Sequence, residues 1–101
     1  MALDFTVLSD RGAPTETVSI QADEHYDIME LAQELKLSKL LSFADYYRDV
    51  DLYPAELPEL AKEISKLEKI TSPALTELIT RLQGLIRLAI TKDKPLCAIP
   101  D

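Results

Sequence analysis

The class of the fold is decided by residues 3–20, LDFTVLSDRGAPTETVSI. Apolar residues occupy every second position in the opening LDFTV and again in the closing TVSI, which is the period of a strand with one buried face. The intervening SDRGAP is rich in residues that form turns. This stretch therefore predicts a β-hairpin. Two strands alone are marginally stable in water, so helices from later in the chain must cover one face of the hairpin.

Three later segments have the apolar spacing of amphipathic helices. The first is expected to begin with Asp23 as its N-cap and to end near Lys36. The second and third each begin near a proline, Pro58 or Pro73, which suits a first helical turn because its nitrogen carries no hydrogen. The third should end near Thr91. The residues expected to be buried are Ile28, Leu31, Ala32 and Leu35; Leu57, Leu60, Ile64 and Leu67; and Leu75, Leu78, Ile79, Leu82, Leu85, Ile86 and Ala89.

Shorter elements are expected between and after these helices. Ser42 is followed three residues later by Asp45, a pattern that predicts a brief helix over residues 42–48. Val50, Leu52 and Tyr53, the residue before Pro54, should be extended. Residues 95–99 are apolar enough to return to the core as a short edge strand.

Together these elements predict a single α+β domain spanning residues 1–101. An N-terminal hairpin, with one or two short extra strands, packs against about four helices, of which the last is long and central. The length and the apolar content of 47% are sufficient to build a core. Gly84 interrupts the last helix, which predicts that another backbone crosses close to it.

The net charge of −7 lies entirely in the first half of the chain. Residues 1–53 carry eleven acidic and four basic side chains, whereas residues 54–101 carry seven of each. An acidic balance disfavours nucleic acid, because phosphate binding requires clustered lysine and arginine. We expect no membrane span and no secretory signal, and a single cysteine agrees with a reducing compartment, so the expected location is cytoplasmic.

The residues that usually carry chemistry are scarce. His25 and Cys97 are the only histidine and cysteine, so they cannot supply the sets of ligands that zinc sites commonly use. The two glycines stand apart and form no phosphate-binding loop. We therefore expect no metal, no cofactor and no enzymatic activity.

The stretch that favours binding is DYYRDVD, residues 45–51, in which carboxylates alternate with large rings. Tyrosine is enriched in binding hot spots, because its ring offers a large contact area and its hydroxyl forms hydrogen bonds. Consecutive helical residues point about 100° apart, so at least one of the two tyrosines should reach the surface. Either one ring is buried while the other lies flat over its neighbours, or the pair belongs to an interface. The candidate partner-binding residues are Asp45, Tyr46, Tyr47, Asp49 and Asp51, with Glu24 and Asp27 as rim charges.

The succession of the LDF and VSI strands, an acidic helix, FADYY at residues 43–47 and LPEL at residues 57–60 resembles small bacterial proteins encoded beside polymorphic toxin genes. Those proteins are suspected immunity proteins. The Tyr-Tyr pair in acidic surroundings is also similar to the toxin-facing segment of immunity proteins against nuclease colicins. This second similarity is local, because the colicin immunity proteins are four-helix domains.

The resemblance implies a small cytoplasmic immunity protein that neutralises a basic toxin domain by covering its surface. The alternative is a structural or adaptor subunit that forms a homodimer through the last helix. That helix is apolar over more than half of its circumference, so it is either central or shared with a second subunit. In a homodimer, Leu88 and Ile90 would be buried between the two copies.

Overall fold

The computed structural model describes residues 2–100, and it has a four-stranded sheet with the strand order β2-β1-β4-β3. Every neighbouring pair of strands is antiparallel. The strands are β1 (Leu3–Leu8), β2 (Pro14–Ile20), β3 (Val50–Leu52) and β4 (Leu96–Pro100). Strands β1 and β2 form the predicted N-terminal hairpin, and β3 and β4 are the additional short strands.

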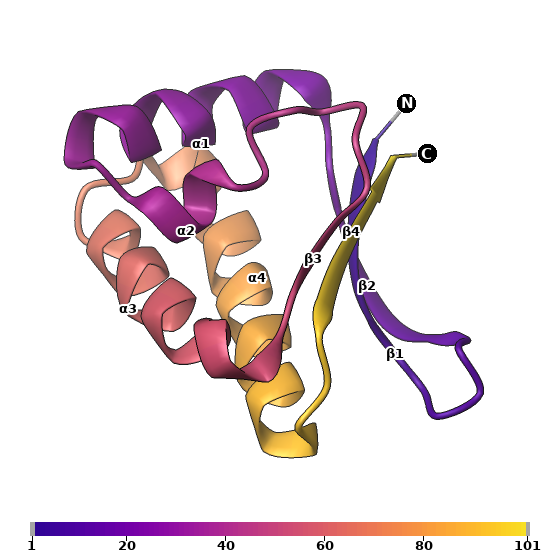
Figure 1. Ribbon diagram of the computed structural model, residues 1–101. Helices are drawn as coiled ribbons and strands as arrows, with labels where there is room; N and C mark the ends of the chain where they lie inside the picture. Colours follow the sequence, from indigo (N-terminus) through magenta and orange to yellow (C-terminus); the bar gives the residue numbers. More distant parts are fainter. Residues whose placement is uncertain (1, 101) are drawn as a thin grey trace.

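Four α-helices complete the predicted α+β fold, and they lie on one face of the sheet (Figure 1). No helix in the described part of the chain covers the other face, which we call the bare face. They are α1 (Ala22–Leu35), α2 (Ser38–Leu41), α3 (Leu57–Glu68) and α4 (Pro73–Lys92), with a short 3-10 helix η1 (Pro54–Glu56) before α3. The long helix α4 packs against α3 and also against β1 and β2, so it is central as predicted. No helix within residues 2–100 combines the length and the apolar character needed to cross a bilayer.

The core lies between the inner face of the sheet and the helices. Phe5 of β1 is opposite Val18 of β2 and Ala98 of β4, and all three side chains are buried. The apolar stripes predicted for α3 and α4 are buried at every position, which confirms both predictions. On α4, Leu88 is half-buried and Ile90 is 37% exposed, so little of the apolar side of this helix remains at the surface.

Helix α1 is rotated from its predicted orientation. The residues that it buries are His25, Ile28, Met29 and Ala32, whereas Leu31 is half-buried and Leu35 is 39% exposed. The N-cap of this helix also lies two residues earlier than expected. Its N-cap is Gln21, whose backbone N–H donates to Glu24 Oε1 at 2.9 Å, so the prediction of Asp23 as the cap was wrong.

Two short elements also differ from the prediction. The brief helix is α2, which ends at Leu41, while residues 42–49 form turns and irregular chain. Strand β4 is not at an edge, because it pairs with β1 on one side and with β3 on the other. The inward side chains Leu96 and Ala98 are fully buried, and burial on this scale favours an interior strand.

Glu63 of α3 caps the start of α2. The N-cap residue of α2 is Leu37, whose side chain cannot accept a hydrogen bond. Glu63 is 4% exposed, and its two carboxylate oxygens accept the backbone N–H groups of Lys39 at 3.2 Å and Leu40 at 2.8 Å. A carboxylate from another helix therefore satisfies two donors that the first turn of α2 leaves without partners.

Gly84 does not mark a close crossing, so that prediction was wrong: a Cβ atom at this position would meet nothing within 4 Å. Glycine in an open helical position costs stability because its backbone loses more freedom on folding. We expect Gly84→Ala to raise the free energy of unfolding by about 1 kcal/mol. Urea unfolding measures this change, and a variant no more stable than the parent would contradict the open environment.

The bare face of the sheet carries a cross-strand row of side chains that includes Cys97. In the register of the strands, Cys97 lies between Thr6 of β1 and Asp51 of β3. Burial raises the pKa of the Cys97 thiol from 9.0 to about 11, and a hydrogen bond to Asp51 together with the charge of that carboxylate adds to the rise. The thiol is therefore protonated, and a weak nucleophile, at neutral pH.

This raised pKa predicts the pH dependence of both reactivity and stability. Because the folded state holds the thiol proton more tightly, the stabilisation is present below pH 9.0 and is lost as the pH rises toward about 11. We expect Asp51→Asn to lower the pKa of Cys97, since the carboxylate raises it, while burial keeps it above its ordinary value. Thiolate absorbance against pH measures this shift. Asp49→Asn is the matched control, and an equal shift in both variants would contradict the assignment.

Candidate functional site

The segment between α2 and β3 is held in place by two buried rings. Phe43 is 1% exposed and packs edge-on against Phe5, with the ring centroids 4.9 Å apart. Tyr46 is 8% exposed, and its hydroxyl donates to the carbonyl oxygen of Ile20 at 3.1 Å. His25 of α1 reaches this segment as well, because its Nε2–H donates to the carbonyl oxygen of Phe43 at 2.7 Å. The loop is thus fixed to both the sheet and α1.

Tyr47 projects from this fixed loop into solvent. Its side chain is 72% exposed, whereas the preceding Tyr46 is buried, which confirms that at least one ring of the pair reaches the surface. The two rings meet edge-on with centroids 5.5 Å apart. Asp45 Oδ1 accepts the backbone N–H of Tyr47 at 3.0 Å and so fixes the turn. The loop presents one tyrosine and supports it with the other.

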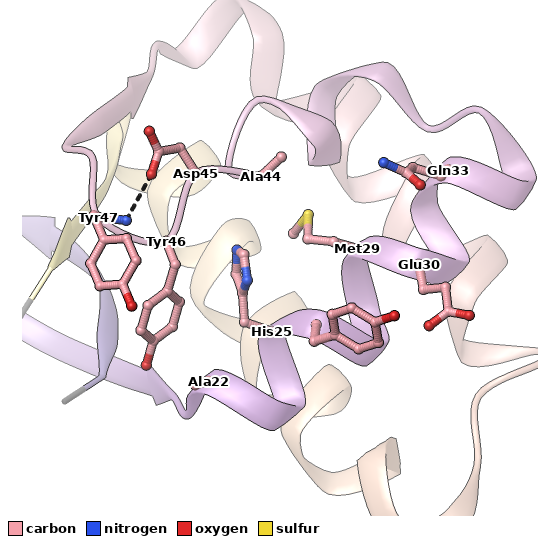
Figure 2. A pocket seen from close by; sticks show the side chains of 10 residues that line it. Ala22, His25, Met29, Glu30, Gln33, Ala44, Asp45, Tyr46 and Tyr47 are labelled. Atoms are coloured by element: carbon pink, nitrogen blue, oxygen red, sulfur yellow. Dashed lines mark hydrogen bonds between the residues drawn. The ribbon is translucent and has the colours of Figure 1, made fainter.

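A groove of about 510 Å³ separates this loop from α1, and we call it the tyrosine groove. Figure 2 shows His25 and Met29 between the tyrosine pair at one end and Glu30 at the other. Its floor consists of buried side chains, and its walls are polar and aromatic. The side chains that form it are His25, Met29 and Tyr46 on the floor, Tyr26, Glu30 and Gln33 on the α1 wall, and Asp45 and Tyr47 on the loop wall.

Charge in the tyrosine groove is negative. Glu30 and Asp45 contribute carboxylates, and no lysine or arginine lines the groove. Neither carboxylate takes part in an ion pair within residues 2–100. The ion pair found there joins Lys94 and Asp10, which do not line the groove. The exposed Tyr26, at 67%, adds a second accessible ring to the site.

The structure separates the other candidate residues from this groove. Asp49 is exposed in the turn that follows Tyr47, close to the groove in sequence. Asp51 lies on the bare face of the sheet beside Cys97, because β3 has already begun at Val50. Glu24 is half-buried and engaged at the start of α1.

Asp27 lines a second groove, of about 290 Å³, on another side of α1. Its floor includes Leu31 and Leu75, and the exposed Ile70 stands beside it. Glu30 lines both grooves, so the outward ridge of α1 carries negative charge continuously from one to the other. The candidate surface is therefore broader than residues 45–51.

Sequence reasoning missed the contribution of Met29, Glu30 and Gln33. A usable signal was present, since Tyr26, Glu30 and Gln33 are spaced as neighbours on one face of a helix. That face became part of a groove only because residues 44–47 pack beside it, a long-range contact that no local pattern reveals. Within residues 2–100, no group of three or more histidine, cysteine, aspartate or glutamate side chains is arranged to hold a metal ion.

Comparisons with protein-family models, with curated proteins and with solved structures find no match for this chain. The functional assignment below therefore depends on the geometry of the site and on the sequence resemblance.

Proposed function

We propose that this chain is a protein-binding module that docks on a basic protein partner through the tyrosine groove. One observation carries the proposal: Tyr47, 72% exposed, stands on a loop that buried rings hold rigid. Exposed aromatic rings are the usual anchors of protein interfaces. A loop that is already ordered loses little entropy on binding, which favours affinity.

The charge of the surface indicates the chemistry of the partner. Asp45 and Glu30 line the groove, Asp49 is exposed two residues after Tyr47 in sequence, and none of the three is neutralised by an ion pair within residues 2–100. A negative surface accelerates association with a positive one and penalises acidic competitors. Together with the resemblance to proteins encoded beside toxin genes, this favours an immunity protein that covers a basic toxin domain in the cytoplasm.

The test is to measure binding to the product of the gene adjacent to the one that encodes this chain, at low and at high salt. We expect tight binding whose association rate falls as salt rises, because the steering charges are screened. Asp49→Lys should slow association about fivefold. Glu77→Lys is the matched control, because it changes the net charge equally at an exposed position on α4, outside the groove.

Two results would remove the proposal. One is the absence of binding at low salt. The other is an equal effect of the Asp49 and Glu77 reversals, which would mean that only the overall charge matters and that the region of the tyrosine groove has no special role.

A further inference from the structure

The tyrosine groove offers different chemistry on its floor and on its walls. The floor residues His25, Met29 and Tyr46 are each less than a tenth exposed. Two of them use polar atoms internally, since His25 Nε2–H donates to Phe43 and the Tyr46 hydroxyl donates to Ile20. The walls, in contrast, carry the exposed rings of Tyr26 and Tyr47 and the carboxylates of Glu30 and Asp45, of which Asp45 also accepts the Tyr47 N–H. A ligand that fits must be apolar along its body and cationic at its tip.

We propose that this groove receives an arginine side chain of the protein partner. The inference rests on the proposed function and specifies how the partner is recognised. The planar guanidinium stacks on the exposed ring of Tyr26, while N–H groups at its edge donate to Glu30, four residues further along α1. Its three-carbon stem packs over the Met29 thioether, a soft apolar surface that adapts to what lies on it.

Arginine fits this groove better than lysine for two reasons. A lysine ammonium is a strongly hydrated point charge, so bringing it over a floor of buried side chains costs more than bringing a guanidinium there. A guanidinium directs five N–H donors outward in its own plane and keeps both faces free for stacking on a ring.

The experiment is an NMR titration of the whole chain with blocked tripeptides, acetyl-Gly-Arg-Gly-amide and acetyl-Gly-Lys-Gly-amide, at equal ionic strength. We expect saturable shifts at the backbone amides of residues 26–33 and 44–47 with the arginine peptide. Its Kd should be about tenfold lower than that of the lysine peptide. Glu30→Gln should weaken arginine binding about fivefold, whereas Glu59→Gln, an exposed position on α3 outside the groove, should leave it unchanged.

Several outcomes would overturn the inference. Equal affinity for the two peptides would show that charge alone is sensed, and shifts confined to the second groove would place the site elsewhere. The absence of saturable shifts at millimolar peptide would also overturn it. Tighter binding of free arginine than of the blocked peptide would indicate an amino-acid ligand instead of a protein side chain.

The titration separates this inference from the proposed function. If the toxin binds but arginine and lysine peptides behave alike, the immunity function stands and the arginine anchor is wrong. If the arginine peptide binds in the groove but the neighbouring toxin does not bind, the anchor stands and the choice of partner is wrong.

Discussion

The Glu63→Ala variant is expected to lower the free energy of unfolding by about 2–4 kcal/mol. The substitution leaves the backbone N–H groups of Lys39 and Leu40 without their acceptor at the start of α2. The N–H of Leu40 is the more costly of the two, because its residue is 1% exposed and water cannot replace the carboxylate. Removing a buried charge returns part of this cost, which keeps the estimate below the sum of two unsatisfied donors.

Glu63→Gln tests the cause of that loss. A glutamine side chain keeps one oxygen acceptor and replaces the other with a donor, so about half of the destabilisation should remain. Glu77→Ala is the control, an exposed glutamate on α4 whose loss should change stability by no more than about 0.5 kcal/mol. Urea unfolding followed by circular dichroism measures all three variants. If Glu63→Ala and Glu77→Ala proved equally stable, Glu63 could not be the cap of α2.

Local patterns in the sequence predict the hairpin, α3 and α4 because each of these elements is amphipathic by itself. The period of two in LDFTV and TVSI places Phe5 and Val18 inside, and the period of α4 places Leu82 and Ile86 inside. These residues need only a generic apolar neighbour. Their burial therefore follows from spacing, whichever element finally covers them.

The features that local patterns do not predict concern residues whose surroundings come from distant parts of the chain. His25 and Met29 are polar or adaptable side chains that are buried because residues 43–47 lie over them. The N-cap residue of α2, Leu37, has no side chain that can cap the helix, and the capping group, Glu63, follows 25 residues after Ser38. Neither the burial of these two side chains nor the capping of α2 by Glu63 can be recognised from the residues that are local in sequence.

The candidate site was predicted in part. Residues 45–51 were treated as one surface, but β3 begins at Val50, and its alternation turns Asp51 onto the bare face of the sheet. Asp45 and Tyr47, in contrast, do line one groove. The wall supplied by α1 could not be predicted, because it depends on how that helix is rotated against the loop.

Tyr47→Ala is expected to weaken binding of the proposed basic partner by at least about 2 kcal/mol, roughly thirtyfold in Kd. The ring is 72% exposed in the free chain, so the loss arises from contacts made in the complex. Folding stability should change little, since most of the ring is exposed to solvent. Surface plasmon resonance of the chain with the proposed basic partner measures the effect.

Tyr53→Ala is the matched control, because Tyr53 is 60% exposed and does not line the tyrosine groove. An equal loss in the two variants would mean that the acidic half of the chain binds without a defined centre.

The rates of association and dissociation distinguish the role of Tyr47 from that of Asp49. Because the loop beneath Tyr47 is fixed by Phe43 and Tyr46, the free and bound conformations should be alike, and Tyr47→Ala should act on dissociation. Asp49→Lys should act on association, since a rim charge guides the encounter more than it holds the complex. A reversed pattern would place Tyr47 at the rim and the carboxylate at the centre.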